Sequence, residues 1–125
     1  MDIKKANFET PLFRLVISVG FAVSFRIGVR DVLAVPADFS TMQFAAIVKN
    51  DSGSWDAVTI SKDNATGMLT LTVPASVSLS GLDGSTTTIV IAYRYSSGGQ
   101  QYALGYGLAD VVDISIESGD LSSWT

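Results

Sequence analysis

The sequence of 125 residues contains no cysteine and no histidine. Without cysteine there is neither a disulfide framework nor thiol chemistry. Without histidine the chain lacks the usual general base, the commonest metal ligand and the side chain that titrates near neutral pH. A serine triad is excluded too, because it needs an imidazole. We therefore expect a protein that is not an enzyme and that carries no cofactor.

Charge is also scarce. Charged residues make up 16% of the chain and apolar residues 47%, with a mean hydropathy of +0.36. The net charge of −4 argues against nucleic acid as a partner, since phosphate binding needs a basic surface. The uncharged run Leu15–Phe25 is shorter than the ~20 residues of a membrane helix, so we expect no membrane partner. So high an apolar content in a small domain fits either a β-sandwich with a full core or an apolar surface that other subunits cover.

Residues 13–30 have the most regular pattern in the chain. Every odd position from Phe13 to Val29 is large and apolar, and most even positions are small or polar. This period of two is typical of strands with one face in a core. A single strand of that length would span roughly 56 Å, which is too long for a small domain. The pattern therefore predicts two strands, or one sharply bent strand, broken near Val19–Gly20.

The same alternation continues along the chain, separated by turn-forming residues. A helix over 41–49 is the alternative for that segment, but the turn residues that follow it favour a strand. Residues 74–82 are expected to form a loop or short helical turn that plugs one end. Strands are predicted over these ranges: 41–49, 56–61, 68–73, 85–95, 100–107 and 108–116.

These segments predict an all-β fold, a single immunoglobulin-like antiparallel β-sandwich of seven or eight strands. We divide the chain into an N-terminal arm over 1–11, the sandwich over 12–116 and a C-terminal tail over 117–125. Four side chains are predicted to be nearly fully buried in the core: Phe21, Phe25, Leu71 and Ile91.

Two groups of carboxylates are candidate sites. Asp51, Asp56 and Asp63 lie in neighbouring loops and could hold calcium, but their spacing matches no known calcium loop. Asp110 and Asp113, with Glu117, form a late acidic group that could do acid–base chemistry if burial separated their pKa values. Loop aspartates and solvated sheet edges are the commoner explanations, and we predict no metal or catalytic residue.

Tyrosines are concentrated in the last strands. Tyr93 and Tyr95 precede the loop Ser96–Gly99, and Tyr102 and Tyr106 follow it. Such rings could form an aromatic platform for a sugar or a peptide, although tyrosines on paired strands often simply pack against one another.

A family resemblance rests mainly on the second half of the chain. A glycine turn at Ala65–Gly67 leads into the alternating strand Met68–Val73, followed by the leucine-bearing turn Leu79–Leu82 and a long strand. A hairpin then ends near glycines in Tyr102–Gly107. This arrangement resembles the immunoglobulin-like β-sandwich at the N-terminus of phage baseplate upper proteins and related virion modules. The resemblance covers most of residues 12–116 and carries over no catalytic residue.

The resemblance implies a structural protein located in a bacteriophage virion, docked on the tail or baseplate among other virion subunits. Because such modules usually head a longer chain and this sequence stops at Thr125, a capsid cement or decoration protein is expected equally. A carbohydrate- or peptide-binding module that uses the tyrosines is the alternative.

The terminal segments suggest how such a protein would assemble. They carry isolated apolar residues on polar stretches that cannot form a core alone. We expect these residues to contact other subunits and the protein to be a homo-oligomer. The residues are Ile3, Phe8, Leu121 and Trp124.

Overall fold

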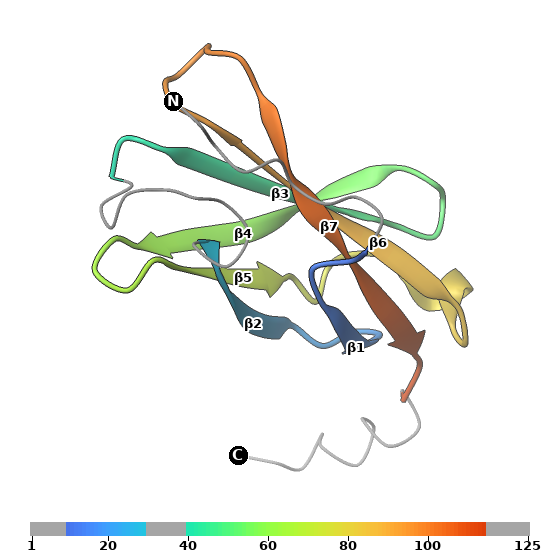
Figure 1. Cartoon of the computed structure of the whole chain (residues 1–125). Helices are drawn as coiled ribbons and strands as arrows, with labels where there is room; N and C mark the ends of the chain where they lie inside the picture. Colours follow the sequence, from blue (N-terminus) through green and yellow to red (C-terminus); the bar gives the residue numbers. More distant parts are fainter. Residues whose placement is uncertain (1–9, 30–39, 115–125) are drawn as a thin grey trace.

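The computed structural model describes residues 10–29 and 40–114, which form seven strands and one short 3₁₀ helix (Figure 1). Within these ranges no helix is long and apolar enough to cross a membrane. The elements are β1 (Arg14–Ser18), β2 (Val23–Gly28), β3 (Gln43–Lys49), β4 (Trp55–Asp63), β5 (Met68–Val73), η2 (Ser80–Leu82), β6 (Thr86–Arg94) and β7 (Tyr102–Val112).

Hydrogen-bonded neighbours give the strand order β1-β7-β6-β3-β4-β5-β2. The sheet folds over at β4. The first part of β4, as far as Val58, pairs with β3, and the part from Thr59 onward pairs with β5. A strand that changes partner in this way makes a corner between two packed sheets. One sheet is therefore β1-β7-β6-β3-β4 and the other is β4-β5-β2, with the core between them.

The connectivity is that of an immunoglobulin-like sandwich. Strands β2, β5 and the end of β4 occupy the places of strands B, E and D, and β3, β6 and β7 those of C, F and G. The predicted all-β fold class is confirmed. The sheet is mixed rather than wholly antiparallel, because β1 runs parallel to β7 from Arg14 to Ser18.

The break predicted in residues 13–30 lies where expected. The chain turns at Val19–Gly20, between β1 and β2, and Gly20 has a φ of +81°. Glycine adopts this left-handed conformation without the steric cost that a Cβ brings. The turn sends β1 to one sheet and β2 to the other, since β1 pairs with β7 and β2 pairs with β5.

The core follows the predicted parity. Leu71 and Ile91 are fully buried, as expected, whereas Phe21 and Phe25 are only partly buried. Phe25 lies at the edge of the core and packs against Phe13, with ring centroids 4.7 Å apart. Its strand β2 ends the sheet and has a neighbour, β5, on one side only, which leaves part of the ring uncovered.

Two predictions about the last strands are wrong, as strand β7 shows. Residues 102–112 form one strand, not two, and the side-chain parity changes within it. Ile91 lies opposite Gly105 whereas Ala92 lies opposite Ala103, so Leu104 is an extra residue in the ladder. This β-bulge turns the odd positions inward beyond Leu104, and Tyr106 therefore does not share the face of Tyr102.

The glycines of β7 make room for the start of β1. A Cβ on Gly105 would lie 2.7 Å from the Leu12 side chain, and one on Gly107 would overlap the Phe13 ring. The backbone at this crossing is hydrogen-bonded, because Leu12 N–H donates to Tyr106 O at 2.7 Å. The Gly-Tyr-Gly sequence thus lets residues 12–13 lie directly on β7.

The core assignment is tested by Leu71→Ala. Leu71 is fully buried at the centre of β5, so its truncation leaves a cavity and should lower the free energy of unfolding by about 2–5 kcal/mol in denaturant titrations. The matched control is Thr70→Ala, one position away with its side chain on the outer face. A loss below about 0.5 kcal/mol for Leu71→Ala would contradict the assignment.

Candidate functional site

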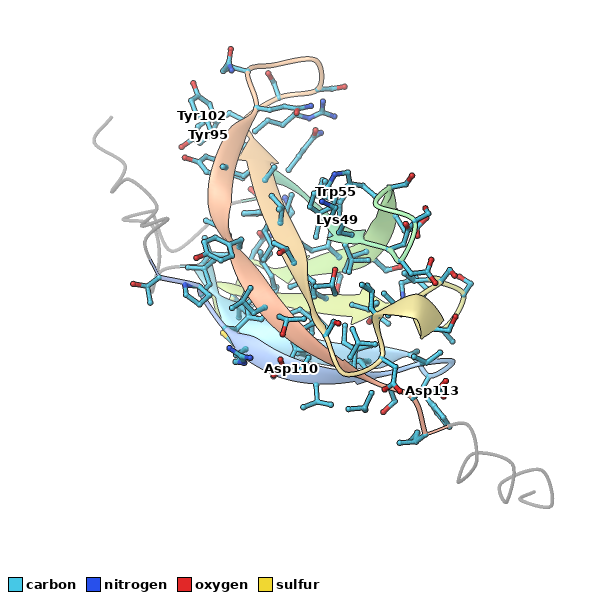
Figure 2. All side chains as sticks on the ribbon, turned by 90° about the vertical axis from the view of Figure 1, so that its right-hand side faces the viewer. Lys49, Trp55, Tyr95, Tyr102, Asp110 and Asp113 are labelled. Atoms are coloured by element: carbon cyan, nitrogen blue, oxygen red, sulfur yellow. The ribbon has the colours of Figure 1, made fainter. Side chains whose placement is uncertain are left out.

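Three of the four tyrosines form a cluster beside the β6–β7 hairpin. Tyr93 and Tyr102 lie opposite each other in the ladder and stack with centroids 5.4 Å apart. Tyr95 meets both rings edge-on, at 5.9 Å from Tyr93 and 6.2 Å from Tyr102. Figure 2 shows Tyr95 and Tyr102 together at this end of the sandwich, well separated from Lys49 and Trp55. Tyr106 lies beyond the bulge, on the other side of the sheet.

The cluster is mainly an extension of the core. Tyr93 is 7% exposed, whereas Tyr102 is 45% exposed and offers most of the accessible ring surface. Burial raises the pKa of both the Tyr93 and the Tyr95 phenol above the ordinary value of 10, so both stay neutral at physiological pH. The Tyr95 hydroxyl is buried and has no hydrogen-bond partner among the residues that the structure describes. A flat ligand could therefore stack on Tyr102, but little accessible surface of the Tyr93 and Tyr95 rings would be left for it to contact.

The aspartates weighed as calcium ligands hold turns instead. Asp51 accepts hydrogen bonds from Ser78 Oγ at 3.0 Å and Gly81 N at 3.2 Å, which ties the β3–β4 turn to η2. Asp56 accepts one from Asn50 Nδ2 at 2.9 Å. Among the residues that the structure describes, no three acidic side chains converge as metal ligands would.

Asp63 has a similar local role. Its carboxylate accepts a hydrogen bond from Ala65 N at 3.0 Å, and the Thr66 side chain together with this backbone bond lowers the pKa of Asp63 below its ordinary value. In the late acidic group, Asp113 N–H donates to Asp83 Oδ1 at 2.9 Å. Glu117 lies outside the described residues, as do the four side chains expected to contact other subunits: Ile3, Phe8, Leu121 and Trp124.

A groove opens where β4 leaves β3. It has a volume of about 560 Å³, and its apolar wall includes Phe44 and Ile60. Lys62 crosses the gap and donates from Nζ to the backbone oxygens of Ser40 at 2.7 Å and Met42 at 2.5 Å. Arg94, on the opposite wall, donates to Gln43 Oε1 at 2.6 Å. Both cations on this groove are therefore already engaged with the protein.

Three of the four exposed large apolar side chains among the described residues lie on the outward side of the larger sheet. Ile47 is 38% exposed, Trp55 45% and Val16 57%, and they stand on three different strands. Between them lie alanines and partly buried aliphatic and aromatic side chains. We call this surface the apolar outer face; its residues are Val16, Ala45, Ile47, Trp55, Ala57, Val90, Ala92, Ala103, Tyr106 and Leu108.

The opposite side of the sandwich is polar. Its ladder places Thr72 between Thr59 and Ser24, and Ser24 Oγ and Thr72 Oγ1 are hydrogen-bonded at 2.7 Å. The next row places Thr70 between Ser61 and Arg26. The two outer faces thus differ in chemistry, hydroxyl-rich over β4-β5-β2 and apolar over the larger sheet.

Sequence reasoning did not single out the apolar outer face. The signal was present, since Ala45 and Ile47 in β3 and Val90 and Ala92 in β6 occupy the parity that should be polar. What the sequence could not show is that β6 and β3 are neighbours, with Ile47 opposite Val90 and Ala45 opposite Ala92. Only the pairing turns two half-apolar strands into one continuous surface.

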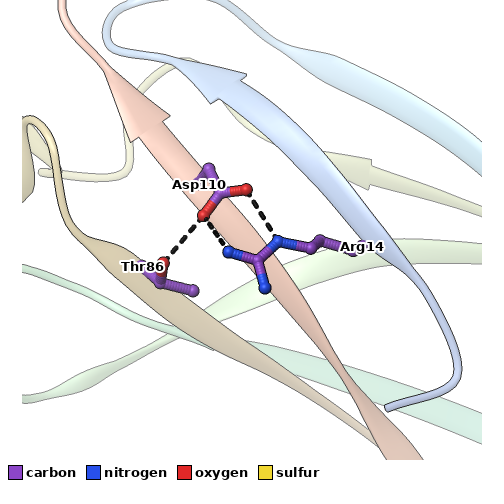
Figure 3. Close-up of polar contacts among 3 residues, drawn as sticks. All are labelled: Arg14, Thr86 and Asp110. Carbon is purple, nitrogen blue, oxygen red and sulfur yellow. Dashed lines mark hydrogen bonds and ion pairs between the residues drawn. The ribbon is translucent and has the colours of Figure 1, made fainter.

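One ion pair closes the edge of this face. Arg14 on β1 donates from Nε to Asp110 Oδ2 at 2.9 Å and from a terminal nitrogen to Oδ1 at 2.8 Å (Figure 3). Thr86 Oγ1 adds a third hydrogen bond to Asp110 Oδ1, at 2.7 Å. These donors, first Arg14 and then Thr86, lower the pKa of Asp110. The network joins β1, β7 and β6 across the sheet.

Comparisons with known proteins give no family. No protein-family model matches the chain, and no curated protein matches it. Among solved structures, the Ig1-2 module of the Drosophila receptor protein tyrosine phosphatase DLAR aligns with 90% of this chain at 11% identity and a TM-score of 0.36. A nucleoside hydrolase-related hypothetical protein from Saccharophagus degradans aligns with 80% at 16% identity and a TM-score of 0.33. The alignments span 48% and 22% of those two chains.

The Asp110 network predicts a dependence of stability on pH. Because the folded-state pKa of Asp110 is depressed, its stabilisation is complete above the ordinary value of 3.8 and is lost as the pH falls through the folded value. In Asp110→Asn, the drop in melting temperature between pH 5 and about pH 2 should be smaller than in the wild type. It should not vanish, because Asp63 contributes with the same sign. An equal drop in melting temperature in the two proteins over this pH range would contradict the prediction.

Proposed function

We propose that this chain is a non-enzymatic structural protein of a bacteriophage particle, a small β-sandwich that docks on capsid or tail in many copies. The observation that carries the proposal is the contrast between the two outer faces. Monomeric proteins rarely expose a large contiguous apolar patch, and such patches usually mark interaction sites. Here the apolar outer face extends from Val16 on β1 across β7, β6, β3 and the start of β4.

Two further features support a docking role over a catalytic one. The chain has no histidine or cysteine. The carboxylates of Asp51, Asp63 and Asp110 each accept hydrogen bonds that hold turns or strands together. The phage assignment rests on the resemblance of most of residues 12–116 to virion sandwich modules. The terminal residues Ile3, Phe8, Leu121 and Trp124 belong to the same proposal, as further contacts with neighbouring subunits.

The location is tested on purified particles. The protein should co-purify with virions produced by a host that carries its gene, and an antibody against it should decorate one repeated position in negative-stain images. Many copies per particle are expected on the capsid, and a single ring or cluster on the tail. Absence of the protein from washed particles, with abundant free protein in the lysate, would contradict the proposal.

A second candidate function is a carbohydrate- or peptide-binding module. The observation that favours it is the cluster of Tyr93, Tyr95 and Tyr102, in which Tyr102 is 45% exposed. Aromatic rings at this exposure can stack on a sugar or a peptide side chain. A glycan and peptide array should then give a ligand whose binding is lost in Tyr102→Ala and kept in Tyr106→Ala, which lies on the other face. An array without any reproducible ligand would remove this alternative.

A further inference from the structure

We infer that residues 1–9 add to the free edge of β7 as a continuation of β1, and that Phe8 covers the exposed part of the Tyr102 ring. The contact lies within one chain and forms before any docking. It goes beyond the proposed function, because it concerns the β6–β7 hairpin end and not the apolar outer face. A ligand that stacks on Tyr102 must first displace Phe8, and Phe8 reaches a neighbouring subunit only after it leaves this site.

Strand β7 has a free edge beside its first residues. On one side it pairs with β6 from Tyr102 to Asp110. On the other side β1 pairs with it only from Leu108 onward, and Leu12 N–H adds a hydrogen bond to Tyr106 O at 2.7 Å. Among the described residues no strand lies beside 102–105 on that side. The backbone groups that point outward there can therefore bond to an added strand.

The chain just before β1 already runs along this edge. Leu12 N–H points at β7, so by the alternation of a strand the backbone of Pro11 points away from it. Proline has no N–H to donate, and at this position none is needed. The proline also favours an extended conformation for Thr10, which keeps the chain alongside β7. Because β1 is parallel to β7, residues 1–9 lead on towards the β6–β7 hairpin.

Side-chain direction brings Phe8 to the face of Tyr102. Leu12 and Phe13 both pack against the core, so the alternation of side chains changes phase between them. Counted back from Leu12 in steps of two, Phe8 falls on the core side of the strand. Tyr102 is on the core side too, because it lies opposite the buried Tyr93.

Position along the strands agrees with this placement. Leu12 lies beside Tyr106. Four residues earlier, about 13 Å in an extended strand, the two strands reach Phe8 and Tyr102. Phe8 stands between an asparagine and a glutamate, the alternation of a strand with one covered face. The Tyr102 ring, 45% exposed, offers the surface on which an aromatic partner can pack.

The test uses pairs of cysteines, since the chain has none of its own. Glu9→Cys/Ala103→Cys leaves Phe8 and Tyr102 unchanged and puts both thiols on the outward side of adjacent strands. Under mild oxidation of the dilute full chain, a disulfide within the chain should form at least about tenfold faster than in the control, because docking holds the thiols within reach. The control is Glu9→Cys/Ser24→Cys, whose second thiol lies on the hydroxyl-rich face.

A second measurement follows the covering of the ring. Phe8→Ser in the full chain should expose Tyr102 and raise severalfold its rate of nitration by tetranitromethane, measured by mass spectrometry of the peptide that contains it. The matched control is Ile3→Ser, which removes another isolated apolar side chain of the same segment and should leave the rate unchanged.

Folding of each variant is checked by thermal melting, and Asn7→Cys/Gln101→Cys replaces the first pair if that pair does not melt cooperatively. A disulfide between chains would assign residues 1–9 to a second copy and overturn the inference. A rate equal to that of the control pair would overturn it too, as would nitration of Tyr102 that Phe8→Ser leaves unchanged. These outcomes leave the docking role untouched, because they concern the free protein and that role is tested on particles.

Discussion

The change of partner along β4 is the constraint on which the rest of the structure depends. Up to Val58 the strand extends the larger sheet, and from Thr59 it belongs to the smaller one. This single corner folds a continuous run of seven strands over its own core. It also explains the groove beside Lys62, because Gln43–Ala45 of β3 stay paired with β6 while β4 leaves β3 to pair with β5. Most importantly, it divides the outward side chains into two faces of different chemistry.

Much of this architecture could be predicted from the sequence. The alternation in residues 13–30 and 68–73 predicts the buried parity, and the length of the first pattern together with Gly20 predicts the turn at Val19–Gly20. These features are local, and they depend on the period of a strand and on the tolerance of glycine for positive φ. Burial of Leu71 and Ile91 followed directly from them.

The errors came from long-range pairing. The sequence near Leu104 does not indicate that one residue will be left out of the ladder, because the bulge depends on the register in which β7 pairs with β6. The parity of Tyr106 was therefore wrong, and with it the grouping of all four tyrosines. The parallel placement of β1 against β7 was missed for the same reason. It requires the glycines at 105 and 107, whose role is visible only when Leu12 and Phe13 lie on them.

Under the proposed function, the apolar outer face is the surface through which this sandwich docks. The Tyr93 ring and the groove beside Lys62 are local features of packing, since Tyr93 is buried and both groove cations are engaged, whereas Tyr102 is 45% exposed and is the ring that the alternative function would use. The hydroxyl-rich face, with its Ser24–Thr72 hydrogen bond, suits contact with water. A protein docked in this way would present its β4-β5-β2 side to solvent and bury its larger sheet against the particle.

The most direct measurement is a comparison of backbone amide hydrogen exchange in the wild-type chain free in solution and bound to purified particles. We predict that the protection gained on binding centres on Ala45, Ile47, Val90 and Tyr106, on three neighbouring strands of one face. Changes centred on Ser24, Thr70 and Thr72, or on the Tyr95–Tyr102 end, would contradict this prediction.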